Sequence, residues 1–261
     1  MIVRMDGRNA LITGGSRGLG KAIATEFLKS GASVAIVARD QATLDAAKSE
    51  LEAVSDGGKV AAISADIRTA EGCAGAHAEA VSAIGDIDVL VNNAGTSQRG
   101  PFLEVGDDLW QDDLDLKLFA AIRLCRLVIP GMRERKWGRI INVLNAGAKV
   151  PNAEGAPTAV SRAAGMSLMK VLANENAAYN VLVNGMLVGK IRSDQWERRW
   201  KKNPDGKTLD EWYDEQGKVL PMGRLGLAEE FANMACLLAS DAGGYVTGAA
   251  INVDGGFCKV V

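Results

Sequence analysis

Residues 13–20 read Thr13-Gly14-Gly15-Ser16-Arg17-Gly18-Leu19-Gly20 and directly follow a short apolar run, residues 10–13. The stretch 17–30, which begins within this segment, carries apolar residues at spacings of three and four, the period of an amphipathic helix. A glycine-rich turn between a strand and a helix lets a pyrophosphate approach the exposed N–H groups at the helix N-terminus. The segment therefore predicts a strand, a turn and a helix that bind a dinucleotide; a tight turn without a ligand is the alternative.

Outward from this turn, the chain alternates short apolar runs with longer amphipathic stretches. The runs are rich in Val and Ile and do not alternate with polar residues, as is typical of parallel strands covered on both faces. They are residues 10–13, 33–38, 60–64, 87–92, 139–144, 181–186 and 249–253. The helical stretches are 17–30, 41–54, 71–84, 109–134, 157–179 and 228–240. The pattern predicts an α/β fold: a single Rossmann-type, doubly wound, seven-stranded parallel sheet with helices on both faces.

One segment, 190–219, breaks this alternation and places three tryptophans and a tyrosine among many charged residues. It predicts a small helical substrate lid above the sheet. Trp196, Trp200 and Trp212 either form walls of the substrate pocket or anchor the lid by packing. No internal repeat, low-complexity tract or linker interrupts the chain, so residues 1–261 are expected to form one domain.

The composition limits the partners that can be expected. Hydrophobic residues make up 48% and charged residues 24% of the 261 positions, as in soluble globular proteins. The net charge of −2 disfavours nucleic acid and anionic membranes as partners, and no run of about 18 apolar residues predicts a membrane span. The start of the chain does not resemble a signal peptide, and the four cysteines are far apart, so a reducing, cytoplasmic location is expected. With His77, expected at the surface, as the only histidine, no metal site is predicted.

Polar segments follow the next three strands at the same edge of the predicted sheet, where ligands of open α/β sheets bind. They are Ala38-Arg39-Asp40, Ala65-Asp66-Ile67 and Asn92-Asn93-Ala94-Gly95. With these motifs, the chain resembles the short-chain dehydrogenase/reductase superfamily over nearly its whole length, and it has the size of the beta-ketoacyl reductase-like enzymes.

The resemblance implies roles for residues along this edge. Asp66 would bond the adenine ring, and the segment from Asn92 to Gly95 would form the floor under the two riboses; a helix cap and a strand end are the alternatives. After the sixth strand, Val188 replaces the usual proline, while Ile191, with Ser193 close by, would still bond the nicotinamide carboxamide. The expected cofactor-binding residues are Gly14, Ser16, Arg17, Gly18, Leu19, Gly20, Arg39, Asp66, Ile67, Asn93, Ala94, Gly95, Arg162, Gly189 and Ile191.

The residues at the ribose end favour NADP(H) over NAD(H). An acidic residue at the end of the second strand accepts hydrogen bonds from the 2′-OH of NAD, whereas a 2′-phosphate requires cations. Arg39 occupies this end, and Arg17 lies within the glycine-rich turn, where its guanidinium group can reach the same phosphate. Asp40 follows directly and remains a possible partner for a ribose hydroxyl, and both arginines remain possible surface residues.

At the four positions that carry catalysis in the family that this chain resembles, the chain has other residue types. The family uses Tyr-x-x-x-Lys, a Ser thirteen residues before the Tyr, and an Asn on the preceding long helix. Thr158, Arg162, Asn145 and Lys117 occupy these positions. A threonine hydroxyl has a pKa far above the tyrosine value of about 10, so Thr158 cannot simply replace the tyrosine as the acid.

Several functional hypotheses remain open. The first is reduction or oxidation of a carbonyl/alcohol pair, or of a conjugated enoyl or imine-like bond, with Lys117 as the proton donor, its pKa lowered by burial beside Arg162, and Asn145 binding the substrate oxygen. Tyr213 of the lid is an alternative acid. If the substrate needs only hydride addition at a conjugated carbon, no acid is required. Lys149 and Glu154, near the same loop, are weaker candidates for a role in the site.

The other hypotheses are a cofactor-binding pseudoenzyme or interaction protein, and a lyase or isomerase that uses Lys117 as a base. The expected partner is a small-molecule substrate. By the resemblance, a homotetramer or homodimer assembles through the long helices 109–134 and 157–179.

Overall fold

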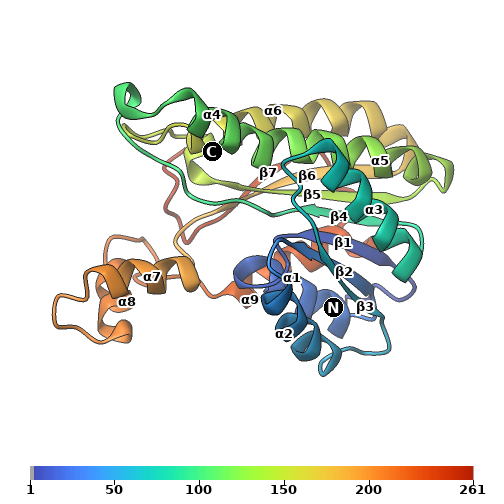
Figure 1. Cartoon of the computed structure of the whole chain (residues 1–261), viewed down its shortest axis with the longest axis horizontal. Helices are drawn as coiled ribbons and strands as arrows, with labels where there is room; N and C mark the ends of the chain where they lie inside the picture. The colour runs from blue at the N-terminus through green and yellow to red at the C-terminus, as the bar shows by residue number, and fades with distance from the viewer. Residues whose placement is uncertain (1–2, 261) are drawn as a thin grey trace.

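The computed structural model describes residues 3–260, so residues 1, 2 and 261 of the predicted domain lie outside the described part. Seven strands form one parallel sheet in the order β3-β2-β1-β4-β5-β6-β7 (Figure 1). They are β1 (Asn9–Thr13), β2 (Ser33–Ala38), β3 (Val60–Ser64), β4 (Val89–Asn92), β5 (Gly138–Asn145), β6 (Val181–Val188) and β7 (Ala250–Val253). The prediction of a seven-stranded Rossmann-type sheet is confirmed.

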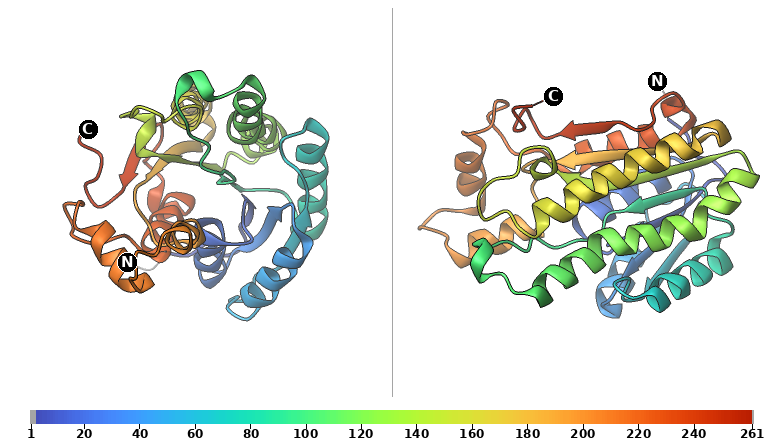
Figure 2. Two further views of the ribbon diagram at one scale, coloured as in Figure 1. Left: turned by 60° about the vertical axis from the view of Figure 1, so that its left-hand side comes forward. Right: turned by 90° about the horizontal axis from the view of Figure 1, so that it is seen from above.

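Helices cover both faces of the sheet. In Figure 1, α3, α5 and α6 lie above the sheet and α1, α2 and α9 below it, and Figure 2 shows the same layers from two other sides. Their bounds are α1 (Gly18–Lys29), α2 (Gln41–Glu52), α3 (Ala70–Ile84), α5 (Ala120–Glu134), α6 (Thr158–Asn176) and α9 (Ala228–Ala239).

Each strand contributes to two hydrophobic cores because its side chains point to opposite faces in turn. Ile12 of β1 packs in one core with Phe27 of α1 and Phe231 of α9. Its neighbour Leu11 packs in the other core with Leu124 of α5. Both faces are therefore apolar, which explains why the strands read as continuous apolar runs in the sequence.

Two predicted helices are interrupted in the structure. The stretch 109–134 forms α4 (Asp107–Leu114), a π-helical turn (Asp115–Phe119) and then α5. The stretch 157–179 forms α6 and a short 3₁₀ turn (Ala177–Tyr179). The π-helical turn lies near the carboxyl edge of the sheet and contacts α6. The irregular part of the stretch 109–134 is therefore close to the candidate site.

Strands β5 and β6 are longer than the predicted runs 139–144 and 181–186. They pair with each other without a break from Gly138 opposite Val181 to Asn145 opposite Val188. This continuous pairing extends the strands past their apolar segments. It places Asn145 and Val188 at the carboxyl ends of their strands, at the ligand edge of the sheet.

The segment after β6 forms α7 (Asp194–Lys202) and α8 (Leu209–Gly217), which project from the sheet in Figure 1. A small aromatic core holds them together: Trp212, Tyr213, Leu220 and Leu225 are buried, and Trp196, Trp200 and Leu209 pack against them. The predicted helical excursion at 190–219 is therefore present as two short helices with their own core.

Candidate active site

A cavity of about 1320 Å³ lies at the carboxyl edge of the sheet and is lined by residues from the strand ends and from α7. Pockets for drug-sized ligands usually measure about 300–1000 Å³. The cavity is thus large enough to hold a dinucleotide together with a small substrate. It opens at the edge where ligands of open α/β sheets bind.

The glycine-rich turn forms one wall of this cavity. Gly14 and Gly18 have left-handed φ values of +66° and +55°, which favour glycine. Arg17 is the N-cap of α1 and its side chain makes no capping hydrogen bond, so the first N–H groups of the helix remain available to an anion. Gly20 does not line the cavity: a Cβ there would lie 2.2 Å from the Gly14 carbonyl oxygen, so its role is to let the turn close on the helix.

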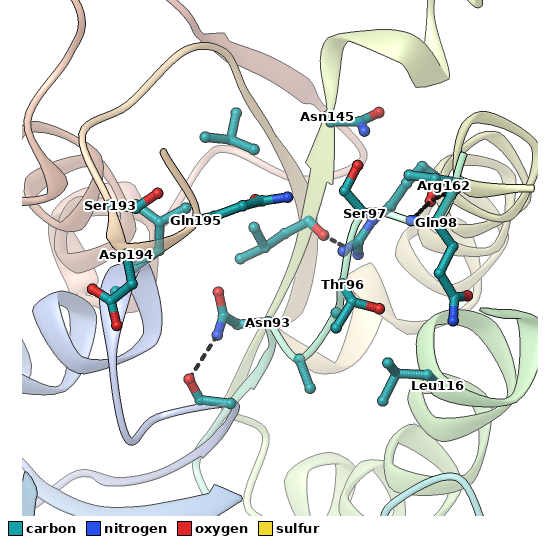
Figure 3. A pocket seen from close by; sticks show the side chains of 18 of the residues that line it. Asn93, Thr96, Ser97, Gln98, Leu116, Asn145, Arg162, Ser193, Asp194 and Gln195 are labelled. Carbon is teal, nitrogen blue, oxygen red and sulfur yellow. Dashed lines mark hydrogen bonds between the residues drawn. The ribbon is translucent and has the colours of Figure 1, made fainter. Parts of the chain in front are cut away.

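Hydrogen bonds join the glycine-rich turn to the end of β4. The Thr13 hydroxyl oxygen accepts bonds from the backbone N–H groups of Asn93 and Ala94, both at 3.0 Å. The Asn93 side-chain amide donates to the Thr13 carbonyl at 2.8 Å, and it faces the cavity in Figure 3. The floor and the wall of the dinucleotide site are therefore one rigid unit.

Two arginines at the ribose end have no acidic partner within the described residues. Arg17 and Arg39 line the cavity and form no ion pair among residues 3–260. Asp40 caps α2 by accepting a bond from the Thr43 N–H at 2.8 Å. That bond, together with the Thr43 hydroxyl and the charge of Arg17, lowers the pKa of Asp40. The carboxylate beside Arg39 is thus already used in a helix cap.

The adenine end holds a second engaged carboxylate. Asp66 and Ile67 line the cavity as expected. Asp66 pairs with Arg68 at 2.5 Å, which lowers the pKa of the carboxyl, and Arg68 also pairs with Asp112 of α4 at 2.5 Å. The adenine end of the cavity is therefore linked through Arg68 to the helix that leads to Lys117.

Lys117 lies in the π-helical turn, and its side chain is 0% exposed. Its Nζ donates hydrogen bonds to the carboxylate of Asp113, which is also 0% exposed, and to the Thr158 Oγ1 at 2.7 Å. Burial and the nearby charge of Arg162 lower the pKa of Lys117 to about 8, while Asp113 acts in the opposite direction. The side chain is a cationic acid that can lose its proton near neutral pH.

Two residues of this buried cluster were missed by the sequence analysis. Asp113 accepts a 2.5 Å hydrogen bond from the Ser161 hydroxyl in addition to the bond from Lys117. The spacing of four residues between Asp113 and Lys117 was the available signal, since such pairs share a helix face. Asp113, Ser161, Lys117 and Thr158 together form what we call the lysine cluster.

Thr158 lies between Lys117 and the cavity. Its hydroxyl donates to the Gln98 carbonyl at 2.8 Å and accepts from the Gln98 N–H at 3.0 Å. Thr158 and Gln98 line the cavity, whereas Lys117 does not. Lys117 therefore reaches the cavity only through the threonine hydroxyl, and not directly as the sequence analysis supposed.

Arg162 and Asn145 complete the reactive end of the cavity (Figure 3). Arg162 donates to the Val143 carbonyl at 2.5 Å, and a Cβ on Gly95 would lie 2.3 Å from its other terminal nitrogen, so glycine makes room for the guanidinium group. Burial lowers the pKa of Arg162 to about 10. The Asn145 side-chain oxygen is buried without a hydrogen-bond partner within residues 3–260. An unpaired acceptor at the cavity wall suits a ligand that donates a hydrogen bond to it.

Some expected residues lie elsewhere. Ile191 is buried and its backbone bridges to Gly226, so it does not line the cavity, although Gly189 and Ser193 do. Tyr213 is only 4% exposed in the core of the lid and does not line the cavity, so its hydroxyl is not placed to act as the acid. Lys149 and Glu154 are also absent from the lining.

The tryptophans of the lid divide between the two expected roles. Trp196 lines the cavity and packs on Trp212 with a ring-centroid distance of 5.7 Å, while Trp200 and Trp212 serve packing. His77 of α3 is partly exposed, and burial of the rest of its side chain lowers its pKa. Within residues 3–260, no three metal-binding side chains gather at one point, and no helix is long and apolar enough to cross a membrane.

The fold, the glycine-rich turn and the strand-end residues define a dinucleotide-binding protein of the Rossmann class. The family model of short chain dehydrogenases matches residues 8–204. The chain belongs to this family, and the resemblance inferred from its motifs is confirmed. A curated relative, the 3-oxoacyl-[acyl-carrier-protein] reductase of Vibrio cholerae, is 32% identical over 262 residues, which are 99% of this chain and 100% of the relative.

Two solved structures are similar over almost the whole chain. L-sorbose reductase from Gluconobacter frateurii, complexed with NADPH and L-sorbose, has 34% identity and a TM-score of 0.95, with 100% of both chains covered. An NADPH-bound short chain oxidoreductase from Pseudomonas aeruginosa, described as containing an atypical catalytic center, has 33% identity and a TM-score of 0.91, covering 99% of this chain and 100% of that one.

Proposed function

We propose that the protein is an NADPH-dependent oxidoreductase that acts on a carbonyl/alcohol pair, or on a conjugated enoyl or imine-like bond, with Lys117 supplying the proton through Thr158. Family membership and the NADPH-bound similar structures support the class and the cofactor. The observation that carries the catalytic part is the 2.7 Å bond from a buried lysine of lowered pKa to a hydroxyl at the cavity wall.

The described residues fit the cofactor along its length. The N–H groups at the start of α1 suit the pyrophosphate, and Arg17 and Arg39 suit a 2′-phosphate. Arg162 suits the hydroxyls of the nicotinamide ribose, because it offers donors and needs no titration. When bound, the nicotinamide supplies the hydride that adds to the substrate carbon.

The chain supplies the proton and holds the substrate oxygen. The side-chain amide of Asn145 donates a hydrogen bond to that oxygen, and the Thr158 hydroxyl turns from the Gln98 carbonyl to give it a proton. Lys117 passes a proton to the threonine oxygen in the same step and becomes neutral. Thr158 ends as it began, so it acts as a relay and its own high pKa is no obstacle. In the oxidative direction the same protons move back.

The cofactor preference gives a direct test at Arg39. Arg39→Asp is expected to weaken NADPH binding about 10- to 100-fold and to leave NADH binding unchanged or stronger, since a bond to a charged group contributes roughly 1.5–3 kcal/mol. Fluorescence titration with both cofactors measures the two dissociation constants. Lys48→Asp makes the same charge change on α2 away from the cavity and is the matched control. Equal weakening for both cofactors would show that Arg39 does not bind the 2′-phosphate.

The lowered pKa of Lys117 predicts opposite pH profiles for the two directions. Reduction needs the protonated amine, so its kcat/KM is expected to be constant below pH 8 and to fall tenfold per unit above it. Oxidation needs the neutral amine and is expected to rise through the same range. Profiles measured with one substrate pair in both directions check this. Parallel profiles would exclude Lys117 as the titrating group, and cofactor binding without conversion of any substrate would favour a cofactor-binding pseudoenzyme.

We also propose a homotetramer or homodimer in the cytoplasm. Three exposed apolar side chains on the long helices support the assembly: Leu127 of α5, and Val160 and Val171 of α6, are 37%, 49% and 52% exposed. Such residues are candidates for burial between subunits. The scattered free cysteines support a reducing compartment.

A further inference from the structure

Three of the cations that line the cavity interact with one another and come from separate parts of the chain, and Arg198 and Lys202 of α7 line the cavity too. Lys190 follows β6, Arg199 lies on α7, and Arg99 lies in the loop between β4 and α4. The proposed catalytic steps use none of them. Their convergence on one cavity wall requires a separate explanation.

None of the three has a counter-charge among residues 3–260. No carboxylate oxygen lies within 4.0 Å of their charged nitrogens. Nearby arginines are paired: Arg192 lies 3.6 Å from Asp210, and Arg224 lies 2.6 Å from Glu230. The charges of Lys190, Arg199 and Arg99 are therefore not neutralised by the protein within the described residues.

The three positive charges repel one another. Burial and the charge of Arg99 lower the pKa of Arg199, and burial and the charge of Arg199 lower the pKa of Lys190. Like charges gathered without a counter-ion raise the free energy of the empty site. An anionic ligand placed among them relieves this repulsion and gains charge-assisted hydrogen bonds.

Aromatic rings hold two of the cations without occupying their hydrogen-bond donors. The Arg199 guanidinium carbon lies 4.7 Å from the centre of the Trp196 ring, and the Lys190 Nζ lies 5.7 Å from the same ring and 5.9 Å from that of Phe257. Both rings line the cavity. Cation–π contacts use no hydrogen-bond acceptor, so N–H groups of both cations remain available to a ligand.

The cations are distant from those assigned to the 2′-phosphate. Lys190 follows β6 and Arg39 follows β2, with β1, β4 and β5 between these strands. Four strand spacings of about 4.8 Å separate the two strands by about 19 Å. One phosphate group cannot contact both ends of the cavity.

We propose that Lys190, Arg199 and Arg99 bind an anionic group, a carboxylate or a phosphate, on the substrate. This proposal rests on the proposed reductase function and adds the substrate class to it. Trp196 and Phe257 pack on the carbon skeleton, the anion lies among the three cations, and the carbonyl group is directed toward Asn145 and Thr158. Guanidinium groups suit both anions because their paired N–H donors match carboxylate and phosphate oxygens.

Matched pairs of ketones test the proposal. NADPH oxidation is measured with 4-oxopentanoate against its methyl ester, and with dihydroxyacetone phosphate against dihydroxyacetone. The charged member of at least one pair is expected to have a kcat/KM at least about tenfold higher, a preference that high salt reduces. The pair with the larger preference distinguishes carboxylate from phosphate.

Variants show whether the three cations cause this preference. Arg199→Gln and Lys190→Gln are expected to remove it without changing the neutral substrates or the dissociation constant of NADPH. Lys201→Gln, on the same helix but outside the cavity lining, is the matched control and is expected to keep the preference. Equal loss for charged and neutral substrates, a preference for the neutral members, or weaker NADPH binding in Arg199→Gln would overturn the proposal.

Calorimetry separates failure of this proposal from failure of the reductase function. If no ketone is reduced, the reductase function fails, and the NADP⁺-loaded protein is titrated with 4-oxopentanoate and with dihydroxyacetone phosphate. Saturable binding of either anion that is lost in Arg199→Gln supports the anion site alone. Absence of binding for both anions overturns it.

Discussion

Replacement of Lys117 by methionine, in a protein that also carries Asp113→Leu, is expected to lower kcat for carbonyl reduction by about 10²- to 10⁴-fold, the usual contribution of a positioned acid. The substrate oxygen then loses the donor behind Thr158, and water does not replace it because the lysine site is closed from solvent. NADPH affinity is expected to remain within about twofold, since neither residue lines the cavity. Single-turnover kinetics and fluorescence titration measure the two quantities.

The double substitution avoids a misleading loss of stability, because removing Lys117 alone leaves Asp113 as a buried, unpaired charge.

A matched pair at Thr158 tests the relay itself. Thr158→Ser keeps the hydroxyl and is expected to retain most of the activity, whereas Thr158→Val has nearly the same shape without the hydroxyl and is expected to be as slow as the double variant. Wild-type kcat in the double variant would place the donor elsewhere.

Asp113→Leu alone is expected to lower the free energy of unfolding by about 3–5 kcal/mol, because it leaves the Lys117 ammonium group buried without its carboxylate. For a chain of this length the melting temperature should fall by about 10 °C. Thermal melts at pH 7 measure this loss. The double variant, which has neither charge, is expected to recover most of the stability.

The same substitution has a signature that a purely structural role would not produce. Asp113 raises the pKa of Lys117 against the effects of burial and Arg162. Without Asp113 that pKa falls further below 8, so the decline of the reduction rate begins at lower pH. In the proposed mechanism, Asp113 is therefore a positioning residue. An unshifted pH profile in Asp113→Leu would show that the lysine cluster does not control the proton transfer.

The fold was predictable because its signals are local. The runs at β2 and β6 are mostly apolar on both faces, and Gly14 and Gly18 of the first turn are required by left-handed φ values within the turn itself. The break in the helix 109–134 was not predictable. The stretch contains no residue that ends a helix near Lys117, and its apolar spacing suits an unbroken helix, so packing against α6 decides the local geometry.

The sequence predicted most of the residues that form the site, but it did not predict which of them are buried behind the cavity wall. Position within the motifs brought Asn145, Thr158 and Arg162 to one cavity, as the structure has them. The spacing of four residues pairs Asp113 with Lys117 on one helix face, but the sequence could not indicate that this face turns inward and is closed from solvent. The cations at the substrate side come from segments about a hundred residues apart, and only the folded chain brings them together.

The number of residues in the π-helical turn determines where the Lys117 amine lies relative to Thr158. A turn with hydrogen bonds from residue i to i+5 contains one more residue than an α-helical turn would need. Deleting a single residue from Asp115–Phe119 would restore regular α-helix and rotate α4 by about 100° relative to α5. If Lys117 itself is kept, its amine would then leave Thr158, and Asp112 of α4 would turn away from the cavity. Reactivity in this fold is therefore encoded partly as a count of residues, which an insertion or deletion can change in one step.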